Sequence, residues 1–568
     1  MYVLQTAKQD ALKLLKAALG KAYTPNVNDL EVPPDVSLGN IAFPCFVVAK
    51  GMKRNPMEIA IEVSAKVAPK GLISKVEARG AYVNFWIDPA KLAERVLKEI
   101  DTAKERYGCS TSGKEKRVLV EYANLNTHKE VHVGHMRNMA LGQASANILK
   151  AAGYHVVPHA YINDLGNAVA RCLWGYQKFH AEEKPEKGAE NAFFGEVYAE
   201  ATRAMEEDVS AKEEISEIQR QLEQGKGEWT KLWKVTNRWS LDGLKAVFDD
   251  FGLHLEKIYL ESDILKASKK IVQSLIKKGI AVHSEGAWVV RLEDEGLGVS
   301  ILVKSDGTHL YNAKDLGLAQ KKEEDYHPDR SIYVVDARQK QVMAQLFATL
   351  RRMGFKKELE HLSYGHVSLP DGAMSSRKGT IIRYQDLMET LEAEAIAETR
   401  SRHEDWSEDR VEAVARAIAF SAVKFFMLRS DPDKDIVFDI KESLSFDGFS
   451  GPYLLYTIAR CKRLLEKSED KPDVQTVRLP FREAQEVVRM LAAFPETVTK
   501  TATDFQVSRV AQSLFELAQA FSTFYAQVPV NTEPDALVRK SGLALVASVA
   551  QTLENGLLLL GIEPVDEM

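Results

Sequence analysis

Two histidines flank a glycine in the string His132-Val133-Gly134-His135, between a predicted strand and a predicted helix. The amino terminus of a helix presents unpaired N–H groups and the positive end of the helix dipole. Gly134 leaves room for a phosphate or an adenine to approach the backbone. Histidines at such a place can donate hydrogen bonds to phosphate oxygens as charge develops in a transition state. The string therefore predicts a site for chemistry on a phosphate group.

Two other interpretations of these histidines are open. His128, His132 and His135 are spaced i, i+4 and i+7, which on a helix would align them as metal ligands. The residues around them are poor helix formers, and no cysteine or carboxylate stands at ligand spacing, so we predict no metal site. The histidines could also be ordinary capping or packing residues.

A second candidate is the string Met374-Ser375-Ser376-Arg377-Lys378-Gly379. Two hydroxyls, two cations and a glycine are typical of a loop that binds anions. Taken alone, such a string is more often an ordinary exposed surface loop. The string follows a predicted α/β domain that begins near the histidine string. This position favours a role in nucleotide binding.

The elements around the histidine string predict a βαβ unit. Residues 117–123 form a short apolar run that suits a buried parallel strand, residues 134–152 have the spacing of a helix that stops at Gly153, and residues 154–162 read as a second strand. Such a unit is the start of a doubly wound, Rossmann-like parallel sheet of the α/β class. Strand-like runs recur near Tyr259 and at 287–292, 299–304 and 331–335.

The chain divides into three predicted domains. Residues 1–105 read as an α+β module, with an amphipathic helix at the start, an apolar stretch at 41–48 and a strand at 81–87. Residues 117–386 form the sheet domain, with a helical insertion at about 165–260. Its charged tracts at 181–190 and 206–228 are typical of solvated helix faces. Residues 387–568 predict an all-α helical bundle.

Composition excludes several classes of protein. The 568 residues carry a net charge of −6, so any nucleic-acid site must be a local basic patch. The four cysteines are scattered, which predicts neither a zinc site nor disulfides. The amino terminus has no signal-peptide pattern, and the most apolar stretch, 542–562, is interrupted by Gln551, Glu554 and Asn555. We therefore expect a cytoplasmic protein without a membrane span.

The two strings together resemble the paired signatures of class I aminoacyl-tRNA synthetases. The longer string VEYANLNTHKEVHVGHMRN, from Val120 to Asn138, is similar to that of arginyl-tRNA synthetases. The segments at 161–166, 310–315, 339–347 and 364–367 and the end of the chain also resemble this family. The resemblance covers nearly the whole chain. It implies that the first domain contacts the tRNA body, the second is the catalytic domain and the third binds the anticodon.

The resemblance implies a set of roles for individual residues. The predicted catalytic residues are Lys129, His132, His135 and Lys378. The predicted ATP-binding residues are His132, Gly134, His135, Gly365, Val367, Met374, Ser375, Ser376 and Lys378. The predicted arginine-binding residues are Glu121, Asn126, Tyr311, Asp315 and Gln339. The predicted tRNA-binding residues are Asn84, Tyr453, Tyr456, Tyr525 and Met568.

Physical chemistry supports part of this assignment independently. A guanidinium is best bound by a fixed carboxylate with flat or polar neighbours, and Tyr311 and Asp315 share a face if a helix begins at Tyr311. The alternative for this pair is packing at a helix end. Unpaired RNA bases stack on aromatic rings, but Tyr453 and Tyr456 are also spaced as ordinary core aromatics.

The activity implied by the resemblance is arginine–tRNA ligation. Arginine and ATP, the latter with Mg²⁺, give arginyl-adenylate and pyrophosphate, and the arginyl group passes to the 3′-terminal ribose of tRNA(Arg). No zinc is expected, and the protein is expected to be a monomer. The sequence departs from the family at Leu165, Val342 and Ile458, at Glu130, and at Ala373, where most of the class has a lysine. Lys129 is predicted to compensate for that missing lysine.

Three rival functions are weighed against this one. A cysteine- or methionine-charging enzyme of the same class commonly has zinc sites, which four scattered cysteines do not supply. A small-molecule nucleotidyltransferase with a similar histidine string would leave the long helical carboxyl-terminal domain unexplained. A non-catalytic RNA-binding relative would not need His132, His135, Ser375, Ser376 and Lys378 intact.

Overall fold

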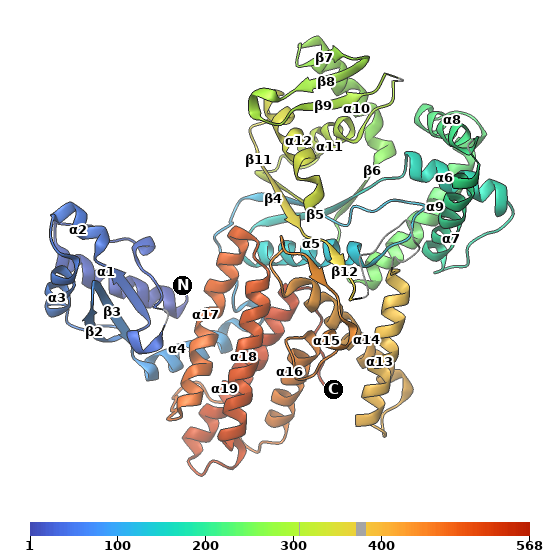
Figure 1. Cartoon of the computed structure of the whole chain (residues 1–568). Helices are drawn as coiled ribbons and strands as arrows, with labels where there is room; N and C mark the ends of the chain where they lie inside the picture. The colour runs from blue at the N-terminus through green and yellow to red at the C-terminus, as the bar shows by residue number, and fades with distance from the viewer. Residues whose placement is uncertain (34, 209, 306, 371–381) are drawn as a thin grey trace.

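The fold is seen in a computed structural model of the chain, which describes residues 1–33, 35–208, 210–305, 307–370 and 382–568. A small amino-terminal domain projects from one side of the body (Figure 1). Its antiparallel sheet has the order β1-β3-β2. The elements of this domain are α1 (Val3–Leu19), β1 (Ile41–Pro44), α2 (Phe46–Met52), α3 (Pro56–Lys66), β2 (Ile73–Arg79), β3 (Tyr82–Ile87) and α4 (Pro89–Ala103).

The second domain is built on one five-stranded sheet in which every pair of neighbours is parallel. Its order is β11-β10-β4-β5-β6, so the strands run third, second, first, fourth and fifth along the chain when counted from β6. This order is that of a doubly wound sheet, the fold class predicted from the sequence, and its switch point lies between β4 and β10. The strands are β4 (Arg117–Glu121), β5 (His155–Ile162), β6 (Lys257–Leu260), β10 (Arg330–Asp336) and β11 (Glu358–Tyr364).

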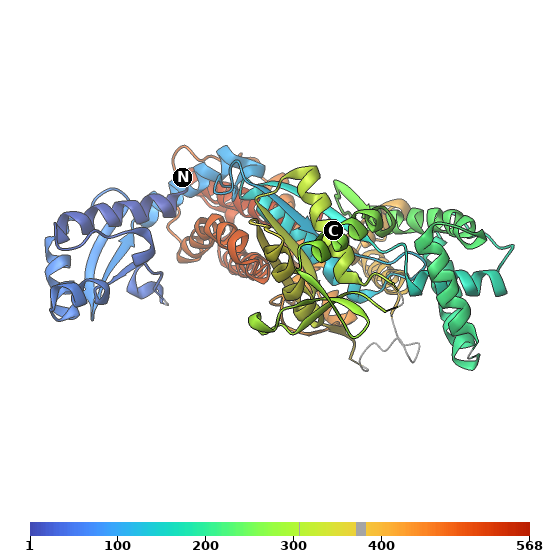
Figure 2. The ribbon, with the colours of Figure 1, turned by 90° about the horizontal axis from the view of Figure 1, so that it is seen from above.

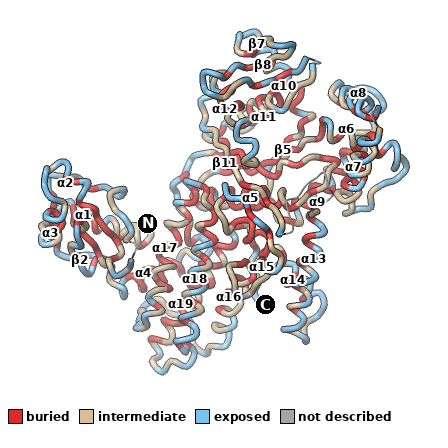
Figure 3. Tube along the Cα trace, in the orientation of Figure 1, coloured by how far each residue is buried: buried red, intermediate tan, exposed pale blue. Residues whose placement is uncertain are grey.

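Helix α5 (Val133–Ala151) begins within the histidine string, directly after His132, and is buried along most of its length (Figure 3). It packs on the sheet through one side and against the carboxyl-terminal helices α14, α17 and α19 through another. A helix with apolar or small residues around its whole circumference is stable only when it is covered on all sides. The amino terminus of α5 is thus held rigidly at the edge where β4 ends.

The insertion consists of four helices that lie together at one side of the sheet domain (Figure 1). Of the two charged tracts predicted to be helical, the described part of 206–228 lies mostly in helices. The prediction for 181–190 is wrong, because 181–189, which contains Pro185 and Gly188, is a loop between two of these helices. Its helices are α6 (Asn167–Phe179), α7 (Glu190–Glu207), α8 (Ala211–Gln224) and α9 (Glu228–Asp250). Seen from above, these helices and the amino-terminal domain occupy opposite ends of an elongated molecule (Figure 2).

The strand-like runs at 287–292 and 299–304 lie outside the parallel sheet. They form strands of a separate antiparallel sheet with the order β7-β8-β9. This small sheet lies between two helices in the chain order, α10 and α11. The elements are α10 (Glu261–Lys277), β7 (Ala281–Ser284), β8 (Ala287–Arg291), β9 (Val299–Val303), α11 (Tyr311–Tyr326) and α12 (Lys340–Arg352).

The rest of the chain is almost wholly helical, as the sequence predicts. A short parallel pair of strands, β12 (Val367–Ser368) and β13 (Ile436–Val437), ties it to the core. The helices are α13 (Tyr384–Arg402), α14 (Glu408–Leu428), α15 (Ile440–Ser443), α16 (Gly451–Glu466), α17 (Arg482–Asp504), α18 (Ser508–Gln527) and α19 (Ala536–Leu559). Helix α19 is long and apolar enough to cross a membrane, but 72% of its apolar window is buried inside the protein.

Candidate active site

A cavity of about 630 Å³ lies at the carboxyl ends of β4 and β10, where the winding of the sheet reverses. Ligands of open α/β sheets bind at this kind of switch point. All five residues predicted to bind arginine line this cavity: Glu121, Asn126, Tyr311, Asp315 and Gln339. The fold therefore brings together residues from a strand, two loops and a helix that are far apart in sequence.

Glu121 is the last residue of β4, and its carboxylate is internally partnered. The Lys322 ammonium forms a buried ion pair with Oε2, His159 Nε2 lies 3.6 Å from the same oxygen, and Asn124 Nδ2 donates to Oε1 at 2.8 Å. Burial would raise the pKa of the Glu121 carboxyl, but the positive charge of Lys322 and the contact with His159 hold it well below its usual range.

Asp315 has a different environment. It lies one turn after Tyr311 on α11, and both side chains line the cavity. Burial, together with the negative charge of Glu121, raises the pKa of Asp315 to about 8. No hydrogen bond or ion pair reaches its carboxylate from the described part of the chain, whereas the Tyr311 ring is 61% exposed at the helix start.

A third carboxylate of the cavity belongs to Asp336, at the end of β10. It accepts hydrogen bonds from Arg338 Nε at 2.9 Å and Nη2 at 2.7 Å. Of the three carboxylates that line the cavity, Glu121 and Asp336 are therefore each paired with a cation. Asp315 is the one cavity carboxylate that has no cationic partner among the described residues.

Uncharged polar groups complete the cavity wall. Asn124 accepts the backbone N–H of Tyr161 at 3.0 Å, and Asn126 pairs with Asn163 through an isolated parallel bridge. The Tyr161 hydroxyl is buried at the cavity without a hydrogen-bond partner among the described residues. A buried hydroxyl of this kind costs free energy until a ligand or water pairs with it. The cavity is thus suited to a polar, cationic ligand.

His132 and His135 form the amino-terminal cap of α5. The Gly134 N–H donates to His132 Nδ1, and the His132 N–H donates to His135 Nδ1, each at 3.2 Å. Both rings accept through Nδ1, so each neutral ring carries its proton on Nε2 and can donate from there. The rings stack with centroids 3.6 Å apart. Burial, then the charges of Lys129, His366 and Arg338, lower the pKa of His132 to about 4.

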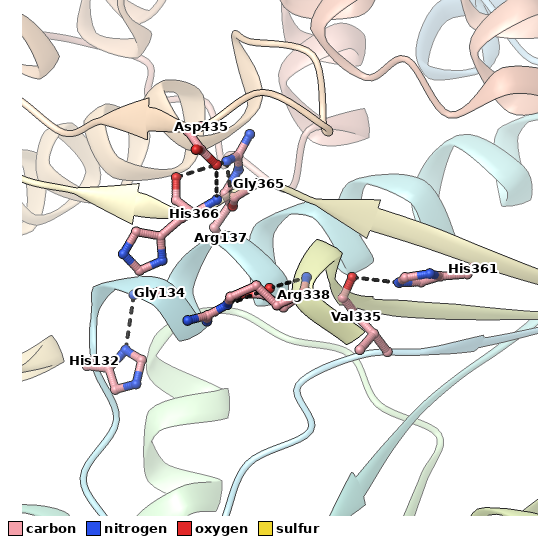
Figure 4. Close-up of polar contacts among 10 residues, drawn as sticks. His132, Gly134, Arg137, Val335, Arg338, His361, Gly365, His366 and Asp435 are labelled. Carbon is pink, nitrogen blue, oxygen red and sulfur yellow. Dashed lines mark hydrogen bonds and ion pairs between the residues drawn. The ribbon is translucent and has the colours of Figure 1, made fainter. Parts of the chain in front are cut away.

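The same causes act on the neighbouring groups. Burial and the proximity of His132 and Lys129 hold the pKa of His135 well below its usual range. Burial, then the charge of Arg171, lowers the pKa of Lys129, whose ammonium lies 5.7 Å from the centre of the Tyr198 ring. Figure 4 shows His366 and Arg338 near the start of α5, beside His132 and Gly134. Several cationic or potentially cationic groups therefore surround the helix amino terminus.

Gly365 is required by the close approach of two backbones. A Cβ atom at this position would lie 2.5 Å from the carbonyl carbon of Lys434 and 2.7 Å from the Asp435 nitrogen. The buried Arg137 of α5 donates to the Gly365 carbonyl at 2.7 Å and to the Pro432 carbonyl at 3.2 Å. Val367 follows in β12 and is buried. These contacts fix the segment that carries His366 against α5 (Figure 4).

The second signature lies outside the described residues, so the roles of Met374, Ser375, Ser376 and Lys378 stay predictions. The metal interpretation of the histidines finds no support in the described ranges, which hold no group of three His, Cys, Asp or Glu side chains able to bind an ion. His128 is instead a packing residue. Its ring is buried, its Nε2 lies 2.9 Å from Thr236 Oγ1 of α9, and burial lowers its pKa to about 3.

Comparisons with known proteins agree with this geometry. Residues 97–440 match the catalytic-domain model of class I (R) tRNA synthetases, residues 9–87 the arginyl-tRNA synthetase N-terminal domain, and residues 454–568 the DALR anticodon-binding domain. The arginine–tRNA ligase of Bdellovibrio bacteriovorus is 37% identical, with 98% of both chains covered. The chain belongs to the arginyl-tRNA synthetase family.

Two further comparisons extend over nearly the whole chain. The arginine–tRNA ligase of Treponema denticola is 33% identical over 96% of this chain and 95% of its own. The solved arginyl-tRNA synthetase of Thermus thermophilus is 26% identical and superposes with a TM-score of 0.83, covering 99% of this chain and 100% of its own. The predicted family and fold class are therefore confirmed, whereas the exact domain boundaries stay predictions.

The residues predicted to contact tRNA lie in two regions of this synthetase. Arg460 stacks between two of them, with its guanidinium carbon 4.6 Å from the Tyr456 ring centre and 5.2 Å from that of Tyr525. Met568 lines a small pocket together with Tyr456. Tyr453 is half-buried, and its hydroxyl lies 3.1 Å from Ser522 Oγ. These four residues thus lie on or against the carboxyl-terminal helices.

Asn84 lies in the amino-terminal domain, on the central strand β3. Its side chain is only 3% exposed, and its Oδ1 has no hydrogen-bond partner in the described part of the chain. Three of the departures from the family pattern, Leu165, Val342 and Ile458, are apolar side chains. Leu165 and Ile458 are buried among other apolar residues, and Val342 lines the cavity.

Several site residues of this family member were missed by sequence reasoning. Lys322, Arg338 and His366 carry charge or imidazole groups at the cavity or at the start of α5, and Tyr161 and Tyr333 line the cavity. Tyr161 and His366 do lie within strings that resemble the family, which was the available signal. The sequence contains no signal for a role of Lys322, because a lysine in a charged run usually lies on a solvated helix face.

Proposed function

We propose that this chain activates arginine with ATP and transfers the arginyl group to tRNA(Arg). The observation that carries the proposal is the state of the cavity carboxylates. Asp315 lacks a cationic partner among the described residues, while Glu121 and Asp336 are each paired. A guanidinium supplies the missing charge and several donors in a fixed plane. Asp315 and Tyr311 would therefore receive the guanidinium.

Glu121, Asn126 and Gln339 would hold the other end of arginine. They line the same cavity and lie at or just after the carboxyl ends of β4 and β10. His135 lines this cavity too, so an amino acid bound between these residues has its carboxylate directed toward the histidine cap. That carboxylate would attack the α-phosphate of ATP in line, forming the adenylate and releasing pyrophosphate.

His132, Gly134 and His135 would bind the ATP phosphates at the helix amino terminus, with Gly365 and Val367 shaping the nucleotide side. Neutral histidines that present Nε2–H donors stabilise charge as it grows on the phosphates. A polyanion also raises the pKa of nearby histidines, which opposes the lowering by burial and by Lys129. Lys129 would supply a permanent charge beside them, together with Met374, Ser375, Ser376 and Lys378 of the second signature.

Mg²⁺ would accompany ATP as its phosphate-bound counterion, where it neutralises phosphate charge. The described residues do not fit a dedicated protein cage for this ion. The residues of the chain therefore act on phosphate through hydrogen bonds and positive side-chain charge. Zinc has no role in this proposal.

The terminal ribose of tRNA(Arg) would then accept the arginyl group from the adenylate. Tyr453, Tyr456, Tyr525 and Met568 would contact the anticodon region. The amino-terminal domain would contact the tRNA body, and Asn84, which is buried in that domain, would act by supporting its surface. Stacking of RNA bases on exposed rings supports the tyrosines, of which Tyr525 is 43% exposed. In this proposal the protein acts as a monomer in the cytoplasm, with no membrane partner.

ATP–pyrophosphate exchange tests the proposal directly. Each amino acid is supplied with ATP in the presence and absence of tRNA(Arg), and citrulline is added as the neutral isostere of arginine. Arginine should drive exchange, whereas lysine and citrulline should be disfavoured by about 10⁴-fold, because a site built for a hydrogen-bonded fork leaves its groups unpaired with them. Equal exchange with lysine would contradict the assignment to arginine.

A further inference from the structure

A buried lysine lies behind the arginine cavity. The Lys322 side chain is 2% exposed and that of Glu121 is 5% exposed, and the two form an ion pair between α11 and the end of β4. The Lys322 ammonium also lies 4.3 Å from the centre of the Tyr333 ring on β10. A lysine this deeply buried is held by its partners, because an unpaired ammonium in this position would be costly. Lys322 is not among the residues that line the cavity.

Lys322 and Asp315 lie seven residues apart on α11, which places them on the same face of the helix two turns apart. Lys322 thus stands near both carboxylates, paired with Glu121 and electrostatically coupled to Asp315. The pairing decides which carboxylate can accept a ligand cation. A cavity with both acids unpaired would offer a guanidinium two competing positions.

We propose that Lys322 is a positioning residue for arginine, because its internal ion pair with Glu121 leaves Asp315 as the carboxylate that receives the guanidinium. The inference rests on the proposed function, since it assumes that arginine binds in this cavity. It assigns Lys322 a role through Glu121 and Asp315, without contact between Lys322 and the substrate.

The groups that face this pair come from every element around it. They are Glu121 of β4, His159 and Tyr161 of β5, Glu261 of α10, Lys314 of α11 and Tyr333 of β10. Burial lowers the pKa of His159, so its ring is neutral near pH 7. Lys314 forms its own buried ion pair with Glu261. For Asp315, Lys322 is the strongest charge that opposes burial and Glu121.

The pH dependence follows from these charges. Asp315 has a raised pKa of about 8, so its charged form and arginine binding increase as pH rises through that value. Removal of the Lys322 charge raises the pKa of Asp315 further. Each additional unit leaves about tenfold less of the carboxylate ionised at pH 7, so the KM for arginine should rise about tenfold.

The experiment measures the KM for arginine by ATP–pyrophosphate exchange with tRNA(Arg) between pH 6.5 and 9.5. Lys322→Met should raise this KM about tenfold or more at pH 7, recover as pH rises, and leave the KM for ATP unchanged. Lys321→Met is the matched control, because Lys321 is the adjacent residue of α11 and pairs with Asp325 on the solvent side. The control should keep the wild-type profile.

A second pair of variants covers the case in which Lys322→Met does not fold. Glu121→Gln leaves Lys322 near Asp315 and should move the profile to lower pH, whereas Glu121→Gln/Lys322→Met removes both charges and should move it back up. A merely structural lysine would give no shift between these two proteins. The inference is overturned if they share one profile, or if Lys322→Met keeps the wild-type profile. A wild-type enzyme that does not exchange with arginine would instead contradict the proposed function.

Discussion

The side of the cavity proposed to bind arginine contains carboxylates that are partly neutralised by buried lysines, whereas the side proposed to bind ATP gathers cations around a helix start. On the first side, Lys322 pairs with Glu121 and Lys314 with Glu261, all four deeply buried. On the second, Lys129 has no ion-pair partner in the described part of the chain, and it lowers the pKa of both His132 and His135.

The difference follows from the charges of the two ligands. A single guanidinium needs one available acid, so internal ion pairs that occupy the other acids give a defined binding position. A triphosphate carries several negative charges spread over a flexible chain, so a cluster of cations and N–H donors is suitable even though the cations repel each other in its absence. The side proposed for arginine therefore offers one defined position to a cation. The side proposed for ATP favours an anion.

The largest effect is expected on the arginine side, from Asp315→Asn. The change is nearly isosteric but removes the charge that faces the guanidinium. Loss of one charge-assisted pair should cost about 2–4 kcal/mol, seen as a KM for arginine raised by about 30- to 1000-fold with the KM for ATP almost unchanged. Asp325→Asn, on the exposed side of α11, is the matched control. An unchanged KM for arginine would make Asp315 a helix-packing residue.

On the ATP side, His135→Ala should lower kcat for adenylate formation by about 10²- to 10³-fold while the KM values change little. A donor that acts on charge growing in the transition state affects kcat selectively. Single-turnover formation of the adenylate is the measurement, and His283→Ala, on the exposed face of β7, is the control. A loss of thermal stability without loss of kcat would favour a packing histidine.

Lys129→Ala should reduce adenylate formation by about 10²-fold, the scale of one electrostatic donor. Most of the class has a lysine where Ala373 stands. Because this chain lacks that lysine, Lys129 should contribute more to stabilising the charge on the ATP phosphates in the transition state. Ala373→Lys in the same protein should restore part of the rate. Wild-type pyrophosphate exchange in Lys129→Ala would refute compensation and leave the arginine assignment intact.

The smallest effect concerns His128, which ties the loop before the histidine cap to α9. Its pKa of about 3 in the folded protein lies below the unfolded value of about 6.5, so the unfolded chain binds more protons as pH falls below 6.5. Each pH unit between these values should lower the unfolding free energy by about 1.4 kcal/mol. His128→Gln should make the loss of thermal stability from pH 7 to pH 5 less steep. An unchanged pH dependence would contradict a neutral, buried His128.

Local patterns in the sequence determined much of this protein. The apolar run before the histidine string, the helix after it and the next strand were predicted because their periodicity is set by neighbours within one element. The shared face of Tyr311 and Asp315 also followed from spacing, once a helix begins at Tyr311, and the structure places that start there. The apolar stretch at 41–48 shows the limit, since strand β1 ends at Pro44 and helix α2 begins at Phe46.

Only the tertiary structure decided which carboxylate is available to a cation. Glu121 and Lys322 are 201 residues apart in the chain, and their contact requires β4 and α11 to be placed by the order of the whole sheet. The same holds for Arg137, which reaches backbone carbonyls of residues 365 and 432 from α5. A sequence specifies residue types and local periodicity, but ion pairs over such separations depend on the packing of elements whose neighbours are chosen by burial of apolar surface across the entire domain.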